Sequence, residues 1–155
     1  MKLAPVIKSL VVALDPPAAF ELFTAGLTRW WPLATYSCAG AVAREVTIEP
    51  RVGGRVIEYA NDGSAAPWGT VLAWEPPHRF AMTWHPQTDP AQATRLEVRF
   101  SGVDEGGCRV ELSHDGWEAR DEAAAAVRER YDGGWIAVLQ RYAAAAQHAE
   151  HQETS

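Results

Sequence analysis

The central part of the chain alternates apolar and polar residues with the two-residue period of a half-buried β-strand. Between residues 43 and 49, Val46 and Ile48 alternate with charged and hydroxyl side chains. The same reading predicts strands at 6–14, 43–49, 55–60 and 68–74, then one with Phe80, Met82 and Trp84, one with Leu96, Val98 and Phe100, and one with Val110, Leu112 and His114. Turns rich in Gly, Pro and Asn join the central runs over hairpin-length connections, so the predicted sheet is antiparallel with one polar face.

Two helical regions flank these strands. After Asp15, a predicted N-cap, Phe20 and Phe23 recur at helical spacing, and residues 24–26 suggest a break between two short helices. From about residue 121, a long helix is predicted by the apolar stripe of Val127, Tyr131, Trp135, Val138, Leu139 and Tyr142. The glycines at 133–134 suggest a close approach of another segment, or a point where the helix begins or bends. The polar residues 147–155 are expected to fray.

The order of elements is strand, two short helices, about six strands and a long helix, without the alternation of a doubly wound sheet. We therefore predict one α+β domain over residues 1–155, with its core over about 6–146. The C-terminal helix is expected to cover the apolar face of a curved sheet, and a straight helix leaves a cavity in a curved trough. In the strand at 68–74, the residues predicted to share a face are Trp68, Thr70, Leu72 and Trp74.

Composition and charge narrow the possible partners. The net charge of −6 argues against nucleic acid, whose phosphates require clustered Lys and Arg. The first 14 residues lack the unbroken apolar stretch of a signal peptide or membrane span, so we expect a cytoplasmic protein without membrane insertion. Cys38 and Cys108 are then expected to be thiols. No metal-binding, phosphate-binding or nucleophile motif is recognisable, so we expect no cofactor, no metal and no catalytic residue identifiable from a motif.

Seven tryptophans are many for a chain of this size, and each aromatic side chain buries about 150–250 Å². Rings on inward positions could line a cavity, or they could form an ordinary core. The candidate ligand-binding residues are Trp30, Trp31, Tyr59, Trp84, Phe100, His114, Tyr131 and Trp135. Because Trp30 and Trp31 are consecutive at a helix end, we expect one to plug the cavity mouth and the other to be exposed.

The orientation of three ionisable residues bears on the function. His114 continues the inward parity of its strand, so it is either a core histidine held by hydrogen bonds or a ligand contact. Glu58 shares the parity of Val56 and could be a buried carboxylate with a binding or acid–base role, although most strand glutamates face water. His85, at a strand end before a proline, is predicted to face solvent.

Six segments carry a family resemblance in their order along the chain. They are Leu-Thr-Arg-Trp-Trp-Pro at 27–32, Val-Gly-Gly-Arg at 52–55, the run at 69–80, Thr-Trp at 83–84, the run at 109–117, and Gly-Trp-Ile-Ala-Val-Leu at 134–139. Together they resemble the START-like superfamily, in the branch named for homologues of the activator of the heat-shock chaperone ATPase. This resemblance implies a helix-grip fold whose pocket, in relatives, accepts lipids, polyketides and other apolar molecules. The chaperone-activating role belongs to longer eukaryotic relatives with a further domain, so the resemblance does not carry that activity over.

Three functions follow as hypotheses. The first is non-catalytic binding of a hydrophobic or aromatic small molecule in an internal cavity. The second is a polyketide cyclase or aromatase, which requires at least two polar side chains converging in the cavity, such as His114 with Glu58 or Tyr131. The third is an interaction module for a chaperone or regulator, marked by an exposed apolar patch. A homodimer is also possible.

Overall fold

The computed structural model describes residues 3–33 and 35–153 and contains one curved antiparallel sheet. Its strands lie in the order β1-β7-β6-β5-β4-β3-β2, and every neighbouring pair is antiparallel. The strands are β1 (Val6–Val12), β2 (Ala43–Ile48), β3 (Arg55–Ala60), β4 (Ala65–Glu75), β5 (Arg79–Trp84), β6 (Thr94–Gly102) and β7 (Cys108–Asp115). The predicted strands are thus all present, and the bounds predicted for β3 are those observed.

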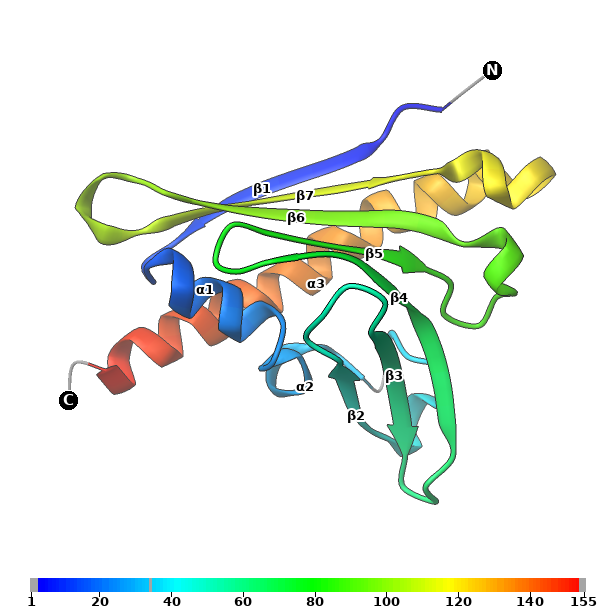
Figure 1. Ribbon diagram of the computed structural model, residues 1–155, viewed down its shortest axis with the longest axis horizontal. Coiled ribbons are helices and arrows are strands. Elements are labelled where there is room, and N and C mark those ends of the chain that lie inside the picture. Colours follow the sequence, from blue (N-terminus) through cyan, green and yellow to red (C-terminus); the bar gives the residue numbers. More distant parts are fainter. Residues whose placement is uncertain (1–2, 34, 154–155) are drawn as a thin grey trace.

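Helices cover one face of this sheet. The α-helices are α1 (Pro16–Phe23), α2 (Leu27–Trp30) and α3 (Ala124–Glu153), and the short 3-10 helices are η1 (Gly40–Val42), η2 (Pro90–Gln92), η3 (Asp104–Gly106) and η4 (Trp117–Ala123). Figure 1 shows α3 running diagonally along the sheet and passing α1 near its C-terminal end. This arrangement confirms the predicted α+β class and the helix-grip fold with a seven-stranded sheet. Within the described residues, no helix is both long and apolar enough to cross a membrane.

The short helices begin where the sequence indicates. The side chain of Asp15 accepts a hydrogen bond from the Ala18 N–H at 3.0 Å, so it caps α1 as predicted. Residues 24–26 separate α1 from α2, also as predicted. The hydroxyl of Thr28 then donates to the carbonyl of Val46 and accepts from its N–H, each at 2.9 Å. These two bonds fix α2 to β2.

Strand β4 departs from simple alternation. Trp68 is buried, but Thr70 and Leu72 face solvent, whereas Val71 and Ala73 are buried. The pairing with β3 skips one residue of β4 at Trp68, and the pairing with β5 skips one at Leu72. Each bulge reverses the side-chain parity. The prediction that these even-numbered residues share one face is therefore wrong.

Helix α3 is continuous through its two glycines. A side chain at Gly133 would meet no atom within 4 Å, and one at Gly134 would lie 3.8 Å from the Tyr36 ring, an ordinary contact. The helix neither begins nor bends at this pair. It also continues to Glu153, so residues 147–153 of the polar tail are helical. Residues 154–155 lie outside the described part.

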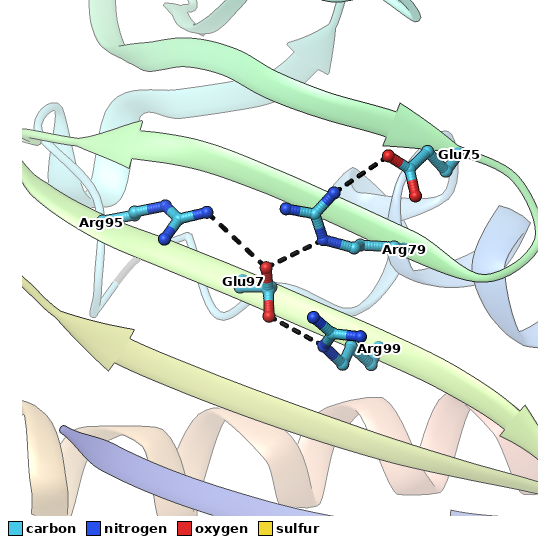
Figure 2. Close-up of polar contacts among 5 residues, drawn as sticks. All are labelled: Glu75, Arg79, Arg95, Glu97 and Arg99. Carbon is cyan, nitrogen blue, oxygen red and sulfur yellow. Dashed lines mark hydrogen bonds and ion pairs between the residues drawn. The ribbon is translucent and has the colours of Figure 1, made fainter.

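The outer face of the sheet carries a charged network (Figure 2). Glu97 on β6 accepts from Arg79 and Arg99 at 2.9 Å each, and Arg95 lies 3.7 Å away. Partial burial raises the pKa of Glu97, but the hydrogen bonds from Arg79 and Arg99 outweigh burial and hold it below its ordinary value. The outer face is thus polar, as the predicted alternation requires, with ion pairs both along β6 and from Arg79 to the neighbouring strands.

Candidate functional site

Aromatic rings fill most of the space between α3 and the sheet. Trp31 lies at the centre, with ring centroids 5.1 Å from Trp68, 5.9 Å from Trp84 and 5.8 Å from Trp135. A second group of rings, toward α1, consists of Phe20, Phe23, Trp30, Phe100 and Tyr142. These rings pack edge to face or tilted, as aromatic side chains prefer. The interior beneath the helix is therefore largely packed.

Trp30 and Trp31 are both buried, at 2% and 7% exposure, so the prediction that one of them is exposed is wrong. Trp30 is the last residue of α2, whereas Trp31 has extended backbone angles, φ −63° and ψ 131°. The chain turns between them, and the helical geometry behind the prediction no longer applies. Trp30 packs toward Phe23 and Tyr142, while Trp31 points toward β4, β5 and α3.

One pocket opens at the end of this aromatic core. It has a volume of about 400 Å³ and lies between the segment after α2, the loop after β5, η4 and the first half of α3. Its lining residues are Trp31, Thr35, Tyr36, Ser37, Trp84, Pro86, Gln87, Thr88, Arg120, Arg130, Tyr131, Gly134, Trp135 and Val138. The floor is buried and apolar, whereas the rim, including Thr35, Tyr36 and Gln87, is exposed. The pocket thus lies between α3 and the sheet, where the sequence predicts a cavity, but it is open at its rim and not enclosed.

The eight candidate residues divide between pocket and core. Trp31, Trp84, Tyr131 and Trp135 line the pocket. The others lie outside it: Trp30, Phe100 and His114 are fully buried, and Tyr59 is half-buried on β3 with its backbone paired to Glu45 and Ala65. Residue 59 has the parity opposite to inward-facing Glu58, so its ring is on the outer face of the sheet.

The indole N–H groups at the pocket are all bonded. Trp31 donates to the carbonyl of Tyr36 at 2.8 Å, Trp84 to the hydroxyl of Tyr131 at 2.9 Å, and Trp135 to Nδ1 of His114 at 3.0 Å. Each ring is therefore fixed in orientation, and the part of it that is left to contact a ligand is its apolar face. The Tyr131 hydroxyl uses a lone pair for Trp84, so its own proton remains available for a donated hydrogen bond.

His114 is a core histidine behind the pocket wall. Its Nδ1 accepts from Trp135, and its Nε2 lies 2.7 Å from Oγ1 of Thr94, which itself donates to the carbonyl of Trp84 at 3.2 Å. Because the single Thr94 proton is used, Nε2 carries the imidazole proton and donates it. Burial lowers the pKa of His114 from 6.5 to about 3. The neutral imidazole thus positions Trp135, and the interpretation as a hydrogen-bonded core histidine is the one observed.

Glu58 is buried and holds the segment that forms one wall. One carboxylate oxygen accepts from the Cys38 N–H at 2.8 Å and from the Trp68 indole at 2.9 Å, and the other accepts from the Ala39 N–H at 2.7 Å. Burial, then the Glu58 charge, raises the pKa of the Cys38 thiol. Cys38 and Cys108 are both free thiols, as predicted. Glu58 is therefore a structural acceptor and does not line the pocket.

His85 is buried at 7% exposure, so its predicted solvent orientation is wrong. The backbone N–H of His85 donates to the carbonyl of Trp68 at 2.7 Å, which extends the β4–β5 contact beyond the end of β5. Nδ1 of His85 and the indole nitrogen of Trp117 are buried without a hydrogen-bond partner among the described residues.

The loops at the rim were not predicted as part of the site. Gln87 adopts a positive φ of 62° and donates weakly, at 3.4 Å, to the carbonyls of Ser37 and Cys38, which joins the two loops. Asp121, which follows Arg120 in η4, has φ 52° and ψ −124°. Non-glycine residues rarely adopt positive φ, and such strain concentrates at functional sites. No periodic pattern marks these segments, so only their irregular composition could have pointed to them.

Other candidate sites are weaker. A second hollow of about 300 Å³ between α1, α2 and the end of α3 is lined by no aromatic residue. Among residues 3–33 and 35–153, no three His, Cys, Asp or Glu side chains gather in a metal-binding group. The aromatic pocket is therefore the site with the clearest chemistry.

Known proteins place the chain in a family. Residues 14–147 match the family model described as activator of Hsp90 ATPase homolog 1-like protein, and no curated protein matches the chain. Among solved structures, the anthrahydroquino-γ-pyrone synthase Txn09 is 36% identical, covers 92% of this chain and 96% of its own, and superposes with a TM-score of 0.64. An Hsp90 activator from Plasmodium falciparum is 20% identical over 73% of each chain, with a TM-score of 0.54. Protein NE0264 from Nitrosomonas europaea is 12% identical, with 94% of this chain and 96% of that chain covered and a TM-score of 0.67.

The last two similarities concern the fold alone, whereas the family match covers most of the sequence. The chain belongs to the family of activator of Hsp90 ATPase homolog 1-like proteins.

Proposed function

We propose that this protein binds a compact polycyclic aromatic molecule in the pocket. The observation that carries the proposal is the pocket floor, where the indoles of Trp31, Trp84 and Trp135 have bonded N–H groups and offer apolar faces. A volume of about 400 Å³ lies near the lower end of small-molecule sites, which span about 300–1,000 Å³. A compact ring system fits such a pocket better than a long lipid chain. The similarity to an anthrahydroquino-γ-pyrone synthase at 36% identity supports the same class of ligand.

A pair of adjacent glycines provides the test. Gly134 lines the pocket and has room for a side chain, so Gly134→Leu is expected to fill the pocket and weaken binding at least about tenfold. Gly133→Leu, one residue away on the exposed side of α3, is the matched control and is expected to change binding less than about twofold. Quenching of tryptophan fluorescence by naphthalene and anthraquinone derivatives measures the affinities. No saturable quenching of the unmodified protein, or equal losses in both variants, would contradict the proposal.

A second candidate function is ring closure on the same class of molecule. It is favoured by the Tyr131 hydroxyl, which lines the pocket and has a proton that it can donate to a carbonyl oxygen of the ligand. When another group of the same molecule adds to the carbonyl carbon, negative charge develops on that oxygen, and the donated hydrogen bond stabilises this charge. The polar pairs expected from the sequence are not formed in the pocket, because Tyr131 lines it whereas His114 and Glu58 do not. The second polar group that this reaction requires would come from another lining residue, such as Thr88 or Arg120. The chaperone-associated alternative rests on the family description and on the fold shared with the Plasmodium falciparum activator, which is 20% identical.

Substitution of Tyr131 separates catalysis from binding. If the protein closes rings, Tyr131→Phe is expected to lower kcat about a hundredfold, because a donor aimed at a developing oxyanion contributes about that much. The affinity for product is expected to change less than about threefold, since the ring remains. Tyr36→Phe, which removes a hydroxyl from the exposed rim, is the control. Equal losses of kcat in the two variants would count against the role of Tyr131.

A further inference from the structure

The charged residues of the pocket lining are all positive. It contains two arginines, Arg120 from η4 and Arg130 from α3, and no Asp or Glu. No acidic residue of the same elements is part of the lining: Glu122 and Glu129 are exposed, and Asp132 is paired with Lys8. We infer, on the basis of the proposed aromatic-binding function, that the ligand is an aromatic carboxylate whose ring system lies on the indoles and whose acid group meets Arg120 and Arg130.

Neither guanidinium has a partner among the residues that the structure describes. Within the described part of the chain, Arg120 and Arg130 form no ion pair and donate no side-chain hydrogen bond. By contrast, Arg79, Arg95 and Arg99 gather around Glu97 on the outer face (Figure 2). Since the protein has a net charge of −6, acidic groups are not scarce. The two positive charges at the pocket therefore remain available for a ligand.

The arrangement suits a carboxylate in particular. A guanidinium presents a planar fork of N–H donors that matches the two oxygens of a carboxylate. Arg120 is half-buried beside the aromatic wall, where water screens an ion pair less than at an open surface. The indoles meanwhile offer apolar faces and no free N–H. The pocket thus combines a ring-stacking floor with a cationic side, which is complementary to an aromatic acid.

Matched acid and amide ligands test this inference. The probes are benzoate with benzamide, 2-naphthoate with 2-naphthamide, and anthraquinone-2-carboxylate with its carboxamide, titrated by calorimetry and tryptophan quenching. For each pair that binds, the acid is expected to bind about tenfold more tightly than the amide at low salt, because the hydrogen bonds are charge-assisted. The difference is expected to shrink in about 0.5 M salt, where the screening length falls to a few ångströms. The amide affinity should change little with salt.

Variants assign the effect to the two arginines. The double variant Arg120→Gln with Arg130→Gln is expected to remove the acid preference and leave the amide affinity within about twofold. Arg109→Gln, at an exposed position on β7, is the control and should keep the preference. Acids and amides that bind equally well would overturn the inference while the proposed function stands. If neither member of any pair binds to the folded protein, the proposed function fails and the inference fails with it.

Discussion

Replacing Glu58 with alanine is expected to lower the free energy of unfolding by about 3–5 kcal/mol. The buried carboxylate accepts from the backbone N–H groups of Cys38 and Ala39 and from the indole of Trp68. Its loss leaves these donors unsatisfied and opens a cavity in the core. Urea unfolding followed by circular dichroism measures the difference.

Two further variants sharpen this prediction. Glu58→Gln keeps the shape and one acceptor oxygen, so it should cost less than the alanine variant. Glu111→Ala removes an exposed glutamate from β7 and is expected to change stability by no more than about 0.5 kcal/mol. A loss of under about 1 kcal/mol for Glu58→Ala would contradict the assigned role of Glu58. The same variant should also weaken ligand binding, because the segment after α2 forms a wall of the pocket.

His114 is expected to make the protein less stable as the pH falls from 7 to 5. Its pKa is about 3 in the folded protein and 6.5 in the reference state, so the unfolded chain binds a proton that the folded chain does not. This contribution to stability is fully present above pH 6.5 and is lost as the pH falls toward 3. At pH 5, the loss from this one residue amounts to about 2 kcal/mol, since each pKa unit is worth about 1.4 kcal/mol.

The prediction is checked by comparing pH slopes. Urea unfolding of the unmodified protein and of His114→Gln at several pH values between 5 and 8 cancels the contributions of the other ionisable groups. The variant should be less stable at pH 7 because it loses ring contacts with Trp117 and Tyr131 at centroid distances of 4.3 and 4.9 Å. Its stability should nevertheless fall less steeply on acidification. Parallel pH profiles would show that His114 is not a buried neutral imidazole.

The fold was largely predictable because most strands alternate without interruption. The pattern in β6 and β7 places Phe100 and His114 on the inward face, and both are there. Glu58 on β3 is also inward, although the sequence leaves its orientation open because most strand glutamates face water. Strand β4 was predicted less well, since its two bulges depend on pairing with β3 and β5 and leave no mark in the alternation.

The site was predictable only in its buried half. Trp84 and Trp135 are in phase with the apolar rows, and both reach the pocket floor. His114 and Phe100 obey the same rule but are covered by other rings, because parity gives the face of the sheet and not the depth below the surface. Gln87 and Arg120 come from segments without a period, and their position at the rim depends on which loops meet in space.

The central claim is that an aromatic ligand binds against the pocket indoles. The most direct measurement follows the indole N–H signals in a ¹⁵N–¹H correlation spectrum during titration with 2-naphthoate. We expect saturable shifts for Trp31, Trp84 and Trp135 and little change for Trp74, whose ring packs between Phe20 and Phe80. Absence of saturable shifts at the three pocket indoles, or equal shifts at Trp74, would contradict the account.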